Sequence, residues 1–207
     1  MSATRPSPQP DRPIEQRRPF WARIEYDGTD FYGFQVQVDQ RTVQGEIERA
    51  LAEIVGSPVR VIGAGRTDRG VHARGQVIGF RVPWRREQDE LQRALNAVLA
   101  ADVAVQAMGP AAEGFHPRFS ALGRSYRYTL LIQLWRSPLA RRTAWQMASE
   151  LDVAKMDQAG QCLLGRHDYA TFGRPPQGEN TVRTVRRAEW RQQGPVLTFD
   201  IEADAFL

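Results

Sequence analysis

The chain has 207 residues, of which 42% are hydrophobic and 25% are charged, as in ordinary globular proteins. Its net charge is +4 at pH 7, and Lys155 is the only lysine, so arginine carries almost all of the positive charge. The single cysteine, Cys162, excludes an intramolecular disulfide, and no apolar run approaches the ~20 residues that span a bilayer. We therefore expect a cytoplasmic protein. Its arginines permit a nucleic-acid partner, although a coding bias toward arginine explains the composition equally well.

The first half of the chain alternates between strands and helices. Residues 1–19 are rich in proline and charge and lack an apolar core segment, which predicts a disordered tail rather than a signal peptide. Alternation of apolar residues over 20–26 predicts a strand. Apolar residues at helical spacing predict helices over 43–55, ending at Gly56, and over 87–99. Short apolar runs predict further strands over residues 58–62, 76–82 and 102–108.

The second half shows the same mixture of elements. Residues 125–135 favour a strand. Asp152 has the position of an N-cap and predicts a helix that reaches Leu164. Clean alternation predicts a hairpin of the strands 181–190 and 196–203.

Strands and helices therefore alternate in both halves of the chain. This order predicts an α+β fold of two similar half-domains, residues 20–112 and 113–207. We expect the two half-domains to share one mostly antiparallel mixed sheet.

A basic stretch without any Asp or Glu runs from Phe115 to Ser149. It interleaves arginines with aromatic residues, a composition that neutralises phosphates and stacks on unpaired bases. A half-buried strand with a solvated basic face is the alternative interpretation. The arginines and aromatic residues are Arg118, Arg124, Arg127, Arg136, Arg141, Arg142, Phe119, Tyr126, Tyr128, Trp135 and Trp145.

The segment from Gly63 to Ala73 is the most informative in the chain. It begins like a phosphate-binding glycine loop, but Asp68 occupies the third glycine position of that motif. The segment also leads into a predicted strand, whereas a dinucleotide-binding loop must open a helix whose N-terminus holds the pyrophosphate. These differences exclude a dinucleotide site.

What remains is an aspartate on a tight loop between arginines. A carboxylate beside Arg66 and Arg69 is expected to be ionised and available as a nucleophile. An aspartate that caps a turn, with its charges paired in solvent, is the alternative. The three histidines and one cysteine are too scattered for a zinc site, so we expect no metal.

The motifs of this chain resemble those of the A-type tRNA pseudouridine synthases. Ala64-Gly65-Arg66-Thr67-Asp68, followed by Gly70-Val71-His72-Ala73, is similar to the signature of that family. Further matches occur in the family's order over residues 20–207. They are Tyr26-Asp27-Gly28, Phe31-Tyr32-Gly33-Phe34-Gln35, Phe115-His116-Pro117-Arg118-Phe119, Arg124 with Tyr126-Arg127-Tyr128, and Asp168 to Phe172.

The resemblance implies isomerisation of uridine to pseudouridine in the anticodon stem-loop of tRNA, at positions 38 to 40, without a cofactor. It implies that Asp68 is the catalytic nucleophile, that Arg66 holds the flipped nucleotide and that Tyr126 stacks on its base. A homodimer is implied as the working form. Weaker candidates for RNA contacts are Arg69, His72, His116, Arg118, Arg124 and Arg127; for His116, a structural role is equally expected.

The family's chain normally continues past Ala205-Phe206-Leu207, so the resemblance also leads us to expect a chain truncated at its C-terminus. Two functional hypotheses follow from this expectation. The first is an active isomerase, and the second is an inactive synthase fold that only binds RNA.

Overall fold

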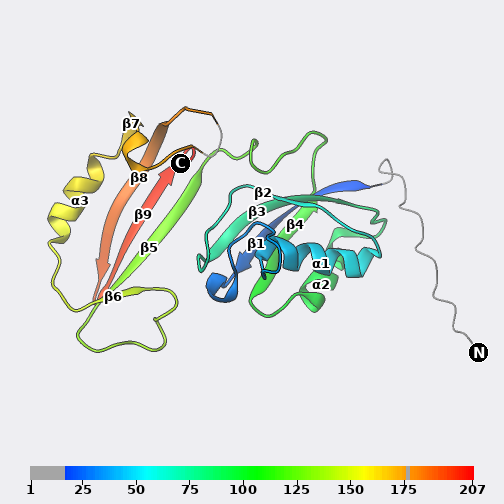
Figure 1. Cartoon of the computed structure of the whole chain (residues 1–207), viewed down its shortest axis with the longest axis horizontal. Coiled ribbons are helices and arrows are strands. Elements are labelled where there is room, and N and C mark those ends of the chain that lie inside the picture. The colour runs from blue at the N-terminus through cyan, green and yellow to red at the C-terminus, as the bar shows by residue number, and fades with distance from the viewer. Residues whose placement is uncertain (1–16, 176–177) are drawn as a thin grey trace, which may run out of the picture. The chain divides into compact units, whose positions relative to one another are not determined.

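The computed structural model of the chain describes residues 17–175 and 178–207, so most of the predicted disordered tail lies outside the described residues. The chain divides into two compact units, residues 1–120 and 121–207. Figure 1 shows the elements of both units in chain order.

The first unit is built on a four-stranded antiparallel sheet in the order β2-β3-β1-β4. Its strands are β1 (Arg18–Tyr26), β2 (Val61–Gly63), β3 (Ala73–Val82) and β4 (Val103–Pro110). Two helices, α1 (Val43–Val55) and α2 (Gln88–Val98), lie on one face of this sheet (Figure 1), and a short 3-10 helix, η2 (Gly28–Asp30), follows β1. The predicted strands and helices of this half are confirmed, with shifts of a few residues at their ends.

Strand β1 is central to this sheet and shows why the unit folds. Phe20, Ala22, Ile24 and Tyr26 are each at most 3% exposed and face the helices, whereas the residues between them are more exposed. They pack into one core with apolar residues of α1 and α2. Because burying each large apolar side chain contributes roughly 1.5–3 kcal/mol, this face dominates the stability of the unit.

Helix α1 has well-defined ends. The Thr42 side chain accepts a hydrogen bond from the backbone N–H of Gly45, which satisfies one of the free donors at the helix N-terminus. Gly56 ends the helix in the left-handed conformation at φ 70°, as its sequence position predicts. The capped start of α1 therefore holds the end of the preceding loop, residues 27–42, in place.

The second unit contains a five-stranded sheet in the order β6-β5-β9-β8-β7. Its strands are β5 (Arg124–Ile132), β6 (Trp145–Met147), β7 (Gly165–Asp168), β8 (Val182–Gln193) and β9 (Val196–Ala203). Only β5 and β6 pair in parallel; the other pairs are antiparallel. Helix α3 (Val153–Gln161) packs against β8, and the short 3-10 helix η3 (Ala170–Phe172) follows β7.

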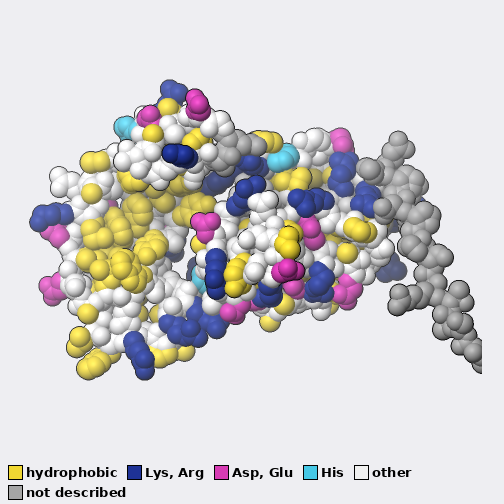
Figure 2. Space-filling model, viewed as in Figure 1, with side chains coloured by type: hydrophobic (Ala, Val, Ile, Leu, Met, Phe, Trp, Pro, Cys, Tyr) yellow, Lys and Arg dark blue, Asp and Glu magenta, His cyan; other side chains and the backbone are white. Residues whose placement is uncertain are grey.

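Two predictions for this unit are confirmed. The side chain of Asp152 accepts a hydrogen bond from the backbone N–H of Lys155, so it caps α3. Strands β8 and β9 form the predicted hairpin. Figure 2 shows hydrophobic side chains gathered on the visible face of this unit.

The α+β class and the mostly antiparallel pairing are confirmed, but the single shared sheet is not. The strands of the described residues pair within two sheets, one in each unit. Alternation along a strand indicates which face is buried, but it carries no information about which strand lies alongside. No helix within the described residues is long and apolar enough to cross a membrane.

An ion pair joins the end of the 27–42 loop to the turn before β4. The Arg41 guanidinium donates to both carboxylate oxygens of Asp102 at 2.7 and 2.8 Å and lies 4.0 Å from the centre of the Phe31 ring. The hydrogen bonds from Arg41 hold the pKa of Asp102 below its ordinary value. The stability that this pair contributes is therefore present above the ordinary carboxyl pKa and is lost as pH falls through the lowered pKa.

We expect Asp102→Asn to lower the free energy of unfolding by about 1 kcal/mol at pH 7, because the pair is partly exposed. This difference from the parent should shrink as pH falls below about 4. Denaturant unfolding at several pH values measures it. Glu113→Gln, which removes the more exposed Arg81–Glu113 pair, is the matched control and should be close to neutral. A difference for Asp102→Asn that is independent of pH would contradict the assignment.

Candidate active site

The candidate site lies on the loop of residues 64–72, which joins β2 to β3. A strand follows the loop, so the structure confirms that its glycines do not open a helix as in a dinucleotide site. The loop lies against the segment of residues 26–35 that follows β1. Its conformation is therefore set by contacts with a segment about forty residues earlier in the chain.

The backbone around Thr67 is held from two sides. The Thr67 side chain hydrogen-bonds the buried Tyr26 hydroxyl at 2.8 Å. The backbone carbonyl oxygen of Thr67 accepts a hydrogen bond from the backbone N–H of Phe34 at 3.0 Å. On the β3 side, the Gln76 side chain donates to the carbonyl oxygen of Gly65 at 2.6 Å. Each bond satisfies a polar group that would cost about 1–3 kcal/mol if it were buried without a partner.

Two glycines allow this close approach. At Gly33, which has φ +90°, a Cβ would lie 2.8 Å from the carbonyl oxygen of Thr67. At Gly28, a Cβ would overlap the carbonyl group of Val71. Any larger residue at either position must push the 64–72 loop away, so the Tyr-Asp-Gly and Tyr-Gly-Phe motifs are explained by backbone contact with that loop.

Asp68 occupies the tip of the loop and is exposed. In the described part of the chain, its carboxylate has no hydrogen-bonding or ion-pair partner, although Arg66 and Arg69 flank it in sequence. The guanidinium of Arg69 instead lies 4.2 Å from the centre of the Tyr32 ring, and the side chain of Arg66 is exposed. The loop thus fixes the backbone of Asp68 while its carboxylate faces solvent.

His72, a predicted RNA contact, lies where the loop meets β3. Its Nδ1 is 3.1 Å from Oδ1 of Asp27 and 3.2 Å from the backbone nitrogen of Gly28. The first contact is an ion pair when the ring is protonated, and the second is a hydrogen bond to Nδ1 when the ring is neutral. In either state, this atom holds the loop against the residues that follow β1.

His116 and Arg118 lie in a turn near the end of the first unit. Nδ1 of His116 accepts from the backbone N–H groups of Arg118 and Phe119 at 3.2 and 3.4 Å, and its ring contacts the Phe119 ring at 4.3 Å. This nitrogen therefore has a structural role. The Phe119 ring is 74% exposed, with the Arg118 guanidinium 5.7 Å from its centre, so the outer part of the turn remains open to a ligand.

The remaining candidates lie on β5 of the second unit, where alternation separates them onto two faces. Tyr126 is 41% exposed and makes an edge contact with the Phe206 ring at 4.9 Å. Arg124, on the same face, donates to the carbonyl oxygen of Asp204 at 3.0 Å. Arg127 points to the opposite face and donates to both carboxylate oxygens of the buried Asp200 at 2.6 and 2.8 Å.

The structure thus identifies contacts that sequence patterns did not show. Arg127 is held in an ion pair with Asp200, which Arg187 also contacts at 3.2 Å. Strict alternation along β5 could have indicated that Arg127 does not share a face with Tyr126. Among the described residues, no group of three or more His, Cys, Asp or Glu side chains is placed to hold a metal ion.

We expect Arg127→Gln to act mainly on stability. It removes the hydrogen bonds that hold the pKa of Asp200 below its ordinary value, and the exposure of Arg127 limits the loss in free energy of unfolding to about 1 kcal/mol. Thermal unfolding measures the loss. Arg166→Gln, at an exposed position on β7, is the control and should be near neutral. Weaker RNA binding by Arg127→Gln with unchanged stability would show that Arg127 is instead an RNA contact.

The sequence of this chain matches a known protein family. The sequence profile of the tRNA pseudouridine synthase family matches residues 22–120 and 159–207 of the chain, which include the 64–72 loop and most of the second sheet.

Individual relatives give the same result. The chain is 43% identical over 185 residues to a tRNA pseudouridine synthase A from Geobacter sp. (strain M21), and the match covers 89% of this chain and 75% of that relative. It is 44% identical over 191 residues to one from Roseiflexus castenholzii, covering 89% and 70% of the two chains. A third, from Nitrosococcus oceani, is 42% identical over 185 residues, covering 89% and 71%. The chain therefore belongs to the tRNA pseudouridine synthase family.

Proposed function

We propose that this protein isomerises uridine to pseudouridine in the anticodon arm of tRNA, at positions 38 to 40, with Asp68 as its nucleophile. The observation that carries the proposal is the contrast within the 64–72 loop. Its backbone is held by hydrogen bonds from two flanking segments, while the Asp68 carboxylate is exposed and has no partner within the described residues. A held backbone with an open carboxylate suits a nucleophile that must meet a bulky ligand.

The reaction needs only groups that such a site can provide. The bond between uracil N1 and the ribose breaks, the base turns, and a bond forms between carbon 5 and the same ribose carbon. Carbon 5 loses a proton and N1 gains one, so substrate and product are isomers, and the change is redox-neutral and needs no cofactor. Asp68 is the nucleophile whether it first attacks the base or the ribose.

The target uridine must leave its stack to reach Asp68, which costs a few kcal/mol. We assign Arg66 to hold the flipped nucleotide and its phosphate, because its guanidinium is exposed and has no acidic partner within the described ranges. We assign Tyr126 to stack on the uracil, because an exposed ring on a strand presents its face at low cost in conformational entropy.

Two finer points rest on the family alone. The working form is proposed to be a homodimer that binds tRNA across both subunits. Its location is proposed to be the cytoplasm, where tRNA is available and where the exposed Cys162 would stay reduced.

Release of tritium from tRNA labelled at uracil carbon 5 tests the proposed reaction directly. Carbon 5 loses its hydrogen only after the new carbon–carbon bond forms. We expect the parent to release tritium and Asp68→Asn to be slower by at least about a thousandfold, since removing a nucleophile leaves only binding and electrostatic effects. Asp30→Asn, which changes an acidic residue on η2, is the matched control. No release from a parent chain shown to be folded would favour an inactive RNA-binding fold instead.

The loop contact at Gly28 gives a second test. We expect Gly28→Ala to slow tritium release by about a hundredfold, because displacing a catalytic group by about 1 Å can cost that much. Gly160→Ala is the control, since its new Cβ meets nothing closer than 3.5 Å. Normal release by Gly28→Ala would sink the idea that contact with the segment after β1 positions Asp68.

A further inference from the structure

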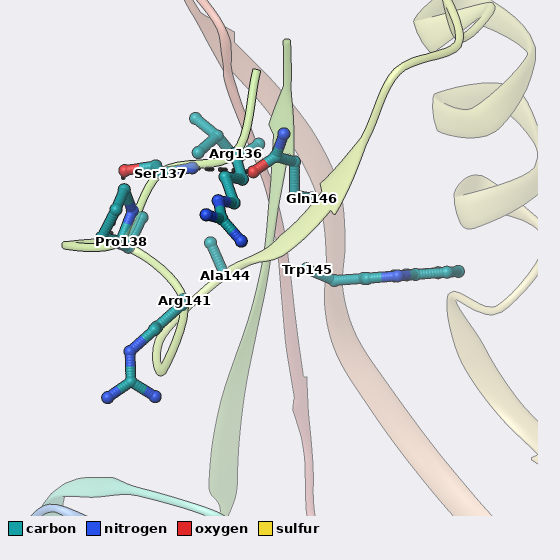
Figure 3. A pocket seen from close by; sticks show the side chains of 9 residues that line it. Arg136, Ser137, Pro138, Arg141, Ala144, Trp145 and Gln146 are labelled. Atoms are coloured by element: carbon teal, nitrogen blue, oxygen red, sulfur yellow. Dashed lines mark hydrogen bonds between the residues drawn. The ribbon is translucent and has the colours of Figure 1, made fainter. Parts of the chain in front are cut away.

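The loop of residues 133–144, between β5 and β6, borders an open hollow of about 530 Å³. That volume lies within the range of about 300–1,000 Å³ that is typical of small-ligand sites. The hollow is lined by parts of the loop together with Leu131, Trp145 and Gln146 (Figure 3). All of these residues belong to the second unit, whereas the 64–72 loop belongs to the first.

Side-chain amides hold this loop in place. Gln146 accepts a hydrogen bond from the backbone N–H of Ser137 at 2.9 Å (Figure 3). It also donates to the carbonyl oxygen of Gln133 at 3.2 Å. Ser137 in turn accepts from the backbone N–H of Ala140 at 3.3 Å. One side chain on β6 thus bridges the two limbs of the loop, and the hollow is formed before any ligand binds.

The charge of the hollow is positive and has no internal compensation. Arg136 lies between the limbs of the loop, and Arg141 extends outward from it (Figure 3). Neither guanidinium has an acidic partner among the residues that the structure describes, and the sequence contains no Asp or Glu from Phe115 to Ser149. By contrast, Arg41, Arg49 and Arg127 all pair with carboxylates within hydrogen-bonding distance.

We propose that this hollow is a binding site for the phosphate backbone of the RNA substrate. A guanidinium presents a planar fork that fits two phosphate oxygens, and two such groups without acidic partners can bind phosphates with no carboxylate to displace. On the same loop, Trp135 is 79% exposed and offers a stacking surface to an unpaired base. This inference rests on the proposed function in one respect, which is that the RNA is tRNA.

A protein partner is the competing occupant. Leu134 and Leu139 are also largely exposed on this loop, and arginine and tryptophan are frequent at protein interfaces. RNA is favoured over a second copy of this loop because the stretch lacks acidic residues throughout, so two such loops would bring like charges together. An interface between two copies of this chain therefore becomes one outcome of the test.

The test compares Arg136→Gln/Arg141→Gln with Arg85→Gln/Arg93→Gln, which removes two exposed arginines of the first unit that belong to neither site. All measurements are made in the Asp68→Asn background, so that turnover does not affect binding. The probe is unmodified tRNA transcript, and its affinity is measured at several salt concentrations. Circular dichroism and thermal unfolding confirm that each variant is folded.

We expect Arg136→Gln/Arg141→Gln to bind about tenfold or more weakly at ~0.1 M salt, with the slope of log affinity against log salt reduced by about one to two. The control pair should keep the parent's affinity and slope. Equal weakening of RNA binding by the loop variant and the control variant would mean that only net charge matters. Unchanged RNA binding by the loop variant would mean that the hollow does not bind RNA. Either result overturns the proposal.

The molar mass of each variant, measured by light scattering, separates the competing occupant. A loop variant that changes molar mass but not RNA affinity would assign the hollow to an interface between copies and overturn the proposal. The proposed function has a separate readout. A parent chain that releases no tritium while the loop variant still binds tRNA more weakly would refute the isomerase and leave the phosphate site standing.

Discussion

The contact between the 64–72 loop and the segment after β1 is the constraint on which the candidate site depends. Thr67 is held through its side chain by Tyr26 and through its backbone by Phe34. This contact is possible only because Gly28 and Gly33 let two backbones approach within a distance that a side chain would forbid. The core brings these two segments together, because it holds the elements at their ends. The 64–72 loop runs from β2 to β3, and the segment after β1 runs to the capped start of α1.

These contacts fix the backbone of the 64–72 loop but leave the Asp68 carboxylate exposed. Polar contacts made by Tyr26, His72 and Gln76 fix the backbone on both sides of Asp68, and the Arg41–Asp102 pair braces the far end of the neighbouring loop. The Asp68 carboxylate itself receives no contact within the described residues. A held backbone that carries a side chain without partners is expected where a ligand makes the contacts to that side chain. Internal partners would have to be displaced before the ligand could bind.

Much of this fold could be predicted from local patterns. Alternation along β1, helical spacing along α1, and the caps at Gly56 and Asp152 are local features of sequence, and the structure confirms them. The division into two sheets could not be predicted, because strand pairing depends on contacts far apart in the chain. The same limit explains Arg127: its charge suggested RNA, but its partner Asp200 lies 73 residues away and on the neighbouring strand.

For the nucleophile that we propose, the exposure of Asp68 has a consequence for catalysis. A carboxylate in water is a poor nucleophile compared with one from which water is excluded, so the reaction needs a bound state in which the substrate covers the loop. The energy for that step must come from contacts away from the reacting base, because flipping the uridine already costs a few kcal/mol. Arginines without acidic partners among the described residues, such as Arg66 on the 64–72 loop and Arg136 in the hollow of the second unit, can provide that energy from the RNA backbone. Binding and chemistry are then linked: phosphate contacts that add nothing to the bond changes themselves determine how completely the flipped uridine excludes water from Asp68.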